Sequence, residues 1–349
     1  MKALVAMSGG VDSSVAAALM KDAGHEVVGV TLKLWSGPNG EAPTAGCCTV
    51  SDAEDARRVA AQLDIPYYVL DYTDEFKGGV VDRFVTDYAS GRTPNPCIEC
   101  NRTVKFDRLL SRLDDFDSDV LVTGHHARTR ENGETWTLHR GEDAAKDQSY
   151  VLSMLTQREL SRTRFPVGEL TKPQVRNVAA GMGLRTARKP ESMDICFVGQ
   201  RDYRGFLSDH APVVFNPGEV VDTAGNTIGE HDGIAGFTIG QRRGLGVALG
   251  EPRFVVRIEP ATSTVVLGSR EDLGVGGVEL EQVTWTTGER HSGLVMAQYR
   301  AHGGPVGATI DGNRLVFDER QSAIAPGQTV AFYEGDMVLG GALIASTIS

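Results

Sequence analysis

Short apolar runs alternate with stretches of helical spacing over the first half of the chain. The clearest stretch contains Val15, Leu19 and Met20 on one apolar stripe, and Gly24 ends it. Strand–helix alternation of this kind predicts an α/β fold with a parallel sheet covered on both faces. The predicted strands are 3–7, 26–34, 66–70 and 119–123, and the predicted helices are 12–23, 51–63 (with Ser51 and Glu54 as a capping box), 74–89 and 104–113.

From residue 213 onward the pattern changes to short β runs separated by glycine-rich turns. Many short strands at regular spacing are typical of small barrels or sandwiches. Lysine is absent after Lys189, so arginine carries all later basic charge. Together these changes predict a domain boundary near residue 205. The predicted strands are 218–222, 254–258, 265–267, 294–299, 306–310, 315–317, 329–333 and 338–344.

Length and composition add three expectations. A chain of 349 residues predicts two or three domains. No apolar run approaches the roughly 20 residues of a membrane span, and the apolar start stops at Ser8, too early for a signal peptide, so we expect a cytoplasmic protein without a membrane partner. Five cysteines are too few for a disulfide scaffold of this size, and reduced or catalytic thiols are the better interpretation.

The net charge of −11 argues weakly against a nucleic-acid partner. Binding depends on local basic groups more than on the total charge, however, and such groups are present. A solvated surface is the ordinary alternative for each of them. They are Arg92, Arg102 and Lys105; Arg185, Arg188 and Lys189; and Arg242 and Arg243.

The segment from Ser8 to Ser14 lies between the first predicted strand and the first predicted helix, where an open α/β sheet binds its ligand. Gly9 and Gly10 let the backbone approach a phosphate, and the helix N-terminus offers N–H groups to an anion. Asp12 would repel phosphate, so we assign it to Mg²⁺ or to a helix cap. Ser-Gly-Gly-Val-Asp-Ser resembles the signature of the PP-loop ATP pyrophosphatases. That resemblance implies cleavage of ATP between its α and β phosphates and adenylation of a substrate oxygen.

Three further segments narrow the resemblance. Residues 91–101 contain Thr-Pro-Asn-Pro-Cys-Ile-Glu-Cys-Asn, whose prolines predict a shaped loop and exclude a helix. Residues 124–128 read Gly-His-His-Ala-Arg, with Lys-Asp-Gln-Ser-Tyr at 146–150, and residues 194–199 read Asp-Ile-Cys-Phe-Val-Gly. With the phosphate loop and residues 165–170, 238–246 and 326–328, these motifs resemble the tRNA-specific 2-thiouridylase (MnmA) family from end to end.

The resemblance implies an architecture and a set of functional residues. It implies a Rossmann-like domain of the adenine nucleotide alpha hydrolase type at 1–205, a small tRNA-clamping domain at 206–270 and a C-terminal β-barrel at 271–349. It also implies a catalytic Cys100 and a persulfide-bearing Cys196. The implied ATP contacts are Ala6, Met7, Ser8, Gly9, Gly10, Val11, Asp12, Ser13, Leu32 and Gly124; the target-base contacts are Asn95, Pro96 and Cys97; the tRNA contacts are His125, Lys146, Asp147, Gln148, Gln298, Tyr299 and Gln328.

The implied chemistry is consistent with these residue types. The 2-oxygen of uracil is a poor leaving group, and transfer of AMP makes it a good one. A persulfide on Cys196 supplies ionised sulfur at neutral pH, and Cys100 cleaves the remaining sulfur–sulfur bond. Turnover then leaves a Cys100–Cys196 disulfide for a cellular thiol to reduce. The expected partners are the anticodon stem-loop of a tRNA and a cysteine desulfurase or sulfur-relay protein, and the expected state is a monomer.

One position departs from the family pattern. Many members carry Asp where this chain has Cys97, and a thiol replaces an acid–base carboxylate only partly. An alternative is an iron–sulfur cluster on Cys97, Cys100 and Cys196, which we favour less; a zinc site is less favoured still. Cys47 and Cys48 are interpreted as buried or incidental thiols.

Two alternative functions remain at this stage. A PP-loop enzyme acting on a small molecule would need neither Cys100 nor Cys196. A non-enzymatic RNA-binding protein would tolerate a damaged phosphate loop, yet every position of Ser8–Ser13 is intact. Phosphate contacts by Arg242, Arg243, Arg300 and Arg320 are predicted from charge alone.

Overall fold

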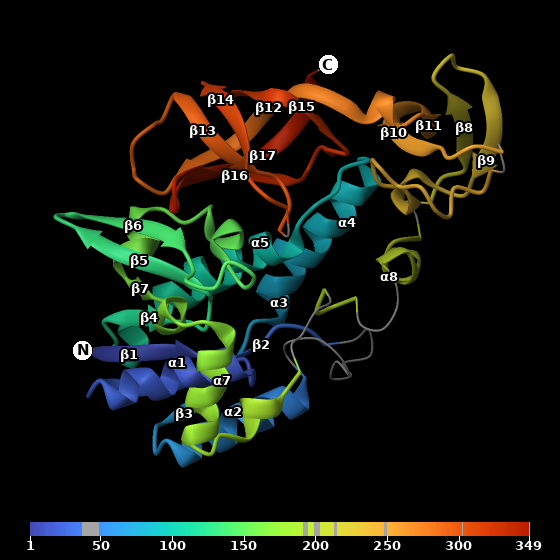
Figure 1. Cartoon of the computed structure of the whole chain (residues 1–349). Helices are drawn as coiled ribbons and strands as arrows, with labels where there is room; N and C mark the ends of the chain where they lie inside the picture. Colours follow the sequence, from blue (N-terminus) through green and yellow to red (C-terminus); the bar gives the residue numbers. More distant parts are fainter. Residues whose placement is uncertain are drawn as a thin grey trace.

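A computed structural model describes residues 1–36, 49–190, 195–198, 203–212, 215–247, 250–301 and 303–348. Cys47, Cys48, most of the segment before Cys196, and Gly199 after it lie outside the described residues. Figure 1 shows three parts: a sheet with helices at the N-terminal end, a small second sheet, and a C-terminal barrel. No helix in the described part is long and apolar enough to cross a membrane.

The N-terminal sheet has five parallel strands in the order β3-β2-β1-β4-β7. Its strands are β1 (Lys2–Ala6), β2 (Glu26–Lys33), β3 (Tyr67–Asp71), β4 (Val120–Val122) and β7 (Thr163–Arg164). The helices are α1 (Val11–Asp22), α2 (Val50–Gln62), α3 (Thr73–Phe76), α4 (Asp82–Ala89), α5 (Pro96–Cys100), α6 (Gln157–Ser161), α7 (Lys172–Gly181) and, outside this unit, α8 (Tyr203–His210).

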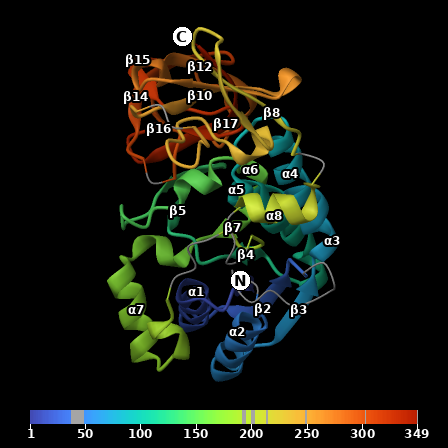
Figure 2. The same cartoon turned by 90° about the vertical axis from the view of Figure 1, so that its right-hand side faces the viewer.

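Alternating side chains of the central strands enter two different cores. Ala3 and Val5 of β1 pack with α1, α2 and α7, whereas Leu4 packs on the opposite face with the helices around α4 and α5. Both faces of the sheet are therefore covered, as the sequence predicts. Figure 2 shows α1, α2 and α7 on the side of the sheet away from the barrel.

Two local predictions were wrong in detail. The capping box of α2 is Thr49 with Asp52, because α2 begins one residue before Ser51. The stretch after Asn95 is a helix, since Pro96 occupies the first helical position, where a missing N–H costs nothing. The helix continues from α5 through the π-helical segment η2 (Asn101–Leu109), and another π segment, η1 (Lys77–Val81), joins α3 to α4.

The middle unit contains a four-stranded sheet in the order β10-β11-β8-β9. Its strands are β8 (Gly218–Asp222), β9 (Thr227–His231), β10 (Phe254–Glu259) and β11 (Thr264–Gly268). A small core of Val220, Ile234, Phe237, Val255 and Leu267 fills it. The sequence analysis predicted three of these strands and missed β9, whose residues are mostly partly or fully exposed.

The C-terminal barrel has six antiparallel strands in the order β12-β15-β14-β13-β16-β17, closed by pairing of β17 with β12. A hairpin from the N-terminal unit, β5 with β6, extends the same sheet through β17, where Val338 pairs with Leu138. These strands are β5 (Ala127–Asn132), β6 (Thr135–Arg140), β12 (Gly274–Trp285), β13 (Gly293–Gln298), β14 (Val306–Asp311), β15 (Arg314–Ser322), β16 (Thr329–Glu334) and β17 (Met337–Ile348).

Candidate functional site

The phosphate loop connects the carboxyl end of β1 to α1. Gly9 has φ +71°, and a Cβ there would lie 2.2 Å from the Asp52 backbone oxygen, so the loop requires glycine at this position. The Ser8 N–H donates to Ser13 Oγ at 3.1 Å, which closes the loop on itself. The N-cap residue of α1 is Gly10, and no side chain caps it. The first N–H groups of this 12-residue helix are therefore left for an anion.

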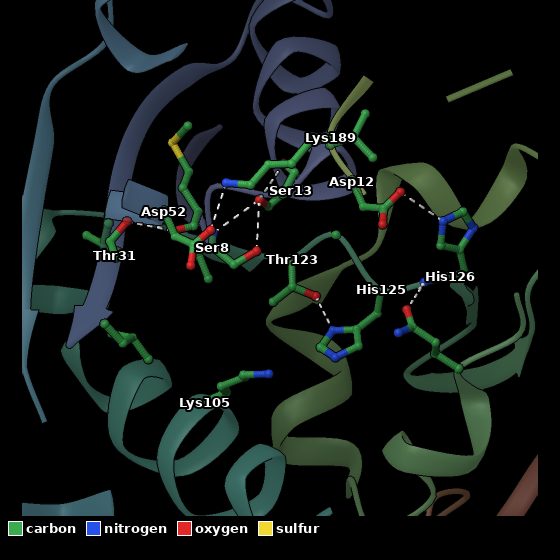
Figure 3. A pocket seen from close by; sticks show the side chains of 18 of the residues that line it. Ser8, Asp12, Ser13, Thr31, Asp52, Lys105, Thr123, His125, His126 and Lys189 are labelled. Atoms are coloured by element: carbon green, nitrogen blue, oxygen red, sulfur yellow. Dashed lines mark hydrogen bonds and ion pairs between the residues drawn. The ribbon is translucent and has the colours of Figure 1, made fainter. Parts of the chain in front are cut away.

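A cavity of ≈ 310 Å³ lies over this loop (Figure 3). It includes every implied ATP contact except Gly9, and also the implied tRNA contacts His125, Lys146 and Gln148. Gly124 closes one wall, because a Cβ there would lie 2.5 Å from the Ser13 backbone nitrogen. The lining residues that the sequence analysis missed are Val30, Thr31, Leu34, Asp52, Lys105, Thr123, His126, Lys172, Lys189 and Pro190.

Asp12 makes intramolecular charge contacts and does not cap α1. Lys172 Nζ donates to its two carboxylate oxygens at 2.8 and 2.7 Å, and His126 Nε2 lies 3.1 Å from Oδ1. Burial alone would raise the pKa of Asp12, but the contacts with His126 and Lys172 lower it below the ordinary value. The capping role predicted for Asp12 is therefore wrong, and its carboxylate is ionised and bound by Lys172.

Lys189 forms a second charged group on the opposite wall (Figure 3). Its Nζ donates to Asp52 Oδ1 at 2.7 Å and to Asp55 Oδ2 at 2.6 Å. Burial alone would lower the pKa of Lys189, but the two carboxylates raise it. The arrangement places a fully charged ammonium group beside the phosphate loop. The sequence places Lys189 in a basic group with Arg185 and Arg188, and its position beside the phosphate loop is set by the fold.

His125 and Lys105 form the floor of the cavity in Figure 3. His125 Nδ1 lies 2.7 Å from Thr123 Oγ1. Burial, with the nearby charge of Lys105, lowers the pKa of His125 to about 3, so the ring is neutral at physiological pH. Lys105 Nζ donates to Asn101 Oδ1 at 3.0 Å. Because Lys105 and Cys100 lie on one continuous helix, that helix connects the cysteine motif to the cavity.

The cysteine motif lies in the first turns of this helix. Asn95 caps it by accepting from the N–H groups of Cys97 at 3.1 Å and Ile98 at 3.4 Å. Cys97 is exposed and Cys100 is buried. Cys196 is half-buried and packs against the same hydrophobic core that contains Cys100. The fold thus places both cysteines on one core, although they are 96 positions apart in the sequence.

Asp147 and Gln298, two of the implied tRNA contacts, accept hydrogen bonds from Arg140 within the protein. Arg140 Nη1 donates to Asp147 Oδ2 at 2.7 Å, and its Nη2 donates to Gln298 Oε1 at 3.0 Å. Both acceptor side chains are buried. Tyr299 donates to Gln321 at 3.0 Å and Gln328 accepts from the Ala325 N–H at 3.1 Å, and both remain half-exposed on the barrel.

The basic groups also differ in exposure. Arg92 pairs with Asp87 and Glu281, and Arg102 pairs with Glu99, so these two are engaged within the protein. Exposed arginines cover other surfaces: Arg185, Arg188, Arg242, Arg243, Arg300 and Arg320.

Family models match all three parts of the chain. The model described as tRNA methyl transferase HUP domain matches residues 1–200. The tRNA methyl transferase PRC-barrel domain model matches residues 204–269, and the aminomethyltransferase beta-barrel domain model matches residues 275–344.

Two relatives that match over their full length have the same name. A tRNA-specific 2-thiouridylase MnmA from Herpetosiphon aurantiacus is 46% identical over 99% of this chain and 98% of its own. Its namesake from Lachnoclostridium phytofermentans is 47% identical over 98% of this chain and 99% of its own. A solved 4-thiouridine synthetase–RNA complex with bound ATP is 17% identical, with a TM-score of 0.36 over 61% of this chain and 51% of that one.

Proposed function

Because this chain belongs to the tRNA-specific 2-thiouridylase family, we propose that it is a sulfurtransferase that uses ATP to replace the 2-oxygen of a tRNA wobble uridine with sulfur. The tRNAs are those for Glu, Gln and Lys. The observation that carries the proposal is the continuity of the cysteine helix with the nucleotide cavity. Cys100 ends α5, the helix continues through η2, and Lys105 of η2 lines the same cavity as the phosphate loop.

The cavity residues fit ATP as a substrate. The N-terminus of α1 has no side-chain cap, and the ammonium groups of Lys172 and Lys189, paired with nearby carboxylates, lie beside it. Leu32 and Gly124 supply a wall for the adenine. We propose that Mg²⁺ enters with the ATP phosphates. Asp12 reaches such an ion only by leaving Lys172.

The sulfur steps follow from the two cysteines. The uracil 2-oxygen attacks the α-phosphorus of ATP and pyrophosphate leaves. The terminal sulfur of a Cys196 persulfide attacks C2 of the ring, and AMP leaves with the former 2-oxygen. The Cys100 thiolate then attacks the Cys196 sulfur, which breaks the remaining sulfur–sulfur bond and releases the 2-thiouridine. The product on the protein is a Cys100–Cys196 disulfide, which a cellular thiol reduces.

We propose that the base and the sulfur donor approach from the side where Cys97 is exposed. We propose that Asn95, Pro96 and Cys97 face the target base, with Tyr299 and Gln328 of the barrel on the tRNA beyond it. A cysteine desulfurase, directly or through a relay protein, supplies the persulfide sulfur, and the enzyme acts as a cytoplasmic monomer. Cys97 is exposed at the first turn of α5, which suits contact with the base better than enclosure in an iron–sulfur cluster.

Turnover with purified components tests this function. Unmodified tRNA, ATP, Mg²⁺, cysteine as the sulfur source, a cysteine desulfurase and a reductant should yield AMP, pyrophosphate and 2-thiouridine, the last measured by mass spectrometry of the nucleosides. Cys100→Ser and Cys196→Ser should each form less than ~1% of the wild-type 2-thiouridine, because each removes a sulfur that the reaction requires. Unchanged 2-thiouridine in both variants would refute the mechanism, and iron bound by wild type but not by Cys97→Ser would favour the cluster alternative.

A further inference from the structure

A buried carboxylate lies next to Cys100. The Glu99 side chain is 7% exposed, and its Oε2 accepts from Arg102 Nη2 at 2.7 Å. Arg83 Nη1, from α4, lies 3.3 Å from the same oxygen. A carboxylate removed from water needs such partners, because the unpaired charge would be strongly unfavourable. Glu99 therefore ties the cysteine helix to two arginines rather than to solvent.

The C-terminal barrel supplies the next contact. Gln282 Oε1 accepts from Arg102 Nη1 at 3.0 Å and from Arg83 Nη2 at 3.5 Å. Gln282 has φ +50°, a left-handed conformation that is uncommon for residues other than glycine. It lies where the pairing of β12 with β17 shifts register, and such irregularities redirect side chains. The backbone of β12 is thus bent so that one amide oxygen meets both arginines.

The barrel also holds the start of the cysteine segment. Glu281 forms an ion pair with Arg92, and the Thr93 N–H donates to the Pro326 carbonyl at 2.8 Å. Gly327 has φ +88°, and a Cβ there would lie 2.9 Å from Arg92 Cβ. Figures 1 and 2 both show α4 and α5 directly beneath the barrel. The segment from Arg92 to Arg102 is therefore fixed to the barrel at both ends.

We propose that the barrel positions Cys100 for sulfur transfer through the cluster of Glu99, Arg83, Arg102 and Gln282. The inference rests on the proposed function and adds positioning residues to it. Cys100 is buried at the end of α5, so a rotation of this helix moves its sulfur relative to Cys196. A displacement of about 1 Å costs roughly 100-fold in the rate of a chemical step. Adenylation uses the phosphate loop, and the residues proposed to face the base lie at the other end of the segment, which the Thr93–Pro326 hydrogen bond holds, so the later step depends on this cluster more than adenylation does.

Gln282→Gly tests the proposal, because it removes the amide oxygen and suits the positive φ. At saturating tRNA and ATP, 2-thiouridine formation should fall roughly 10- to 100-fold, while tRNA-dependent pyrophosphate release and the KM for tRNA stay within about twofold. Without substrates, iodoacetamide should alkylate Cys100 of this variant at a different rate from Cys100 of wild type. Mass spectrometry of the peptide that contains Cys100 measures this rate. Gln282→Glu should retain wild-type values, because a carboxylate also accepts from both arginines.

Ser263→Gly is the matched control, since Ser263 has the same φ of +50° but lies in the middle unit. It should leave all measurements unchanged. Three results for Gln282→Gly would each overturn the proposal. They are equal losses of pyrophosphate release and thiolation, a change confined to the KM for tRNA, and an unaltered rate of Cys100 alkylation. If wild type forms no 2-thiouridine, the proposed function fails, and the alkylation rates still decide the positioning role. Glu99→Gln provides a second variant. Its 2-thiouridine formation should also fall, while its pyrophosphate release stays within about twofold of wild type.

Discussion

Asp12 shows how a single carboxylate is kept ionised in the nucleotide cavity. It is bound by Lys172, whose side chain is 9% exposed. Lys172→Met should lower the free energy of unfolding by about 2 kcal/mol at pH 7, because the carboxylate loses its principal partner. Urea unfolding measures this change in the free energy of unfolding. Lys77→Met, at an exposed ion pair with Asp82, should change it by less than about 0.5 kcal/mol.

The same ion pair predicts a pH dependence. The pKa of Asp12 is lowered in the folded protein, so the pairing stabilises fully above the unfolded value and is lost as pH falls through the folded value. The stability difference between wild type and Lys172→Met should therefore narrow below about pH 4. A difference that stays constant down to pH 3 would contradict the assignment.

His125 should remain neutral throughout the physiological range. Its pKa is lowered to about 3, mainly by burial, so the folded protein binds fewer protons here than the unfolded chain. This contribution to stability is present above about pH 6.5 and is lost as pH falls toward the folded value. An NMR titration of labelled histidine should show no His125 midpoint between pH 5 and 8. A midpoint near 6.5 would place the ring in water rather than in the cavity wall.

At the scale of elements, the close approach of β4 to α1 depends on Gly124. Gly124→Ala would bring a Cβ to 2.5 Å from the Ser13 nitrogen, so either the phosphate loop or the strand end must shift. We expect at least ~10-fold weaker ATP binding by calorimetry, because the loop is displaced. Gly181→Ala on α7 is the matched control. A Cβ there meets nothing within 4 Å, so this variant should be neutral or slightly stabilising.

Helix and strand periodicity predicted most elements but not those set by distant contacts. The β5–β6 hairpin was missed because Arg128, Arg130 and Glu131 show no apolar alternation, and its pairing with β17 holds it instead. The helix at Pro96 contradicts the prediction of a loop because proline breaks a helix only in its interior and is favoured at the first helical position. The π segments have no signal in the residue pattern.

The site was predictable where its residues are contiguous. The phosphate loop is one motif, and its residues other than Gly9 line the cavity. Lys172 and Lys189 were missed because they reach Asp12 and Asp52 from more than 130 positions away. The capping box at Thr171 marks the start of α7 and places Lys172 at a helix N-terminus, but only the fold directs it to Asp12.

At the scale of the whole molecule, Arg140 joins the N-terminal unit to the barrel. It contacts Asp147 and Gln298, and its guanidinium lies 3.7 Å from the ring centroid of Tyr333. Arg140→Met should destabilise the protein by about 2–4 kcal/mol, because it leaves a buried carboxylate and amide without this donor. In calorimetry, the unfolding transition of the barrel should also separate from that of the N-terminal unit.

Arg130→Ala serves as the comparison for Arg140→Met. Arg130 is on the same hairpin, is exposed, and lies 4.0 Å from Asp336. It should change the free energy of unfolding by less than about 0.5 kcal/mol and preserve a single transition. Equal effects of the two variants would show that Arg140 has no special part in joining the units.

The pairing of β6 with β17 restricts how the enzyme can open. Met337 and Val338 of β17 pair with His139 and Leu138 of β6, so separating the nucleotide unit from the barrel would break a continuous sheet. In the described part of the chain, the middle sheet shares no strand pairing with either neighbour. Any opening that separates the barrel from the nucleotide unit must therefore break this pairing, whereas a movement of the middle sheet would leave it intact.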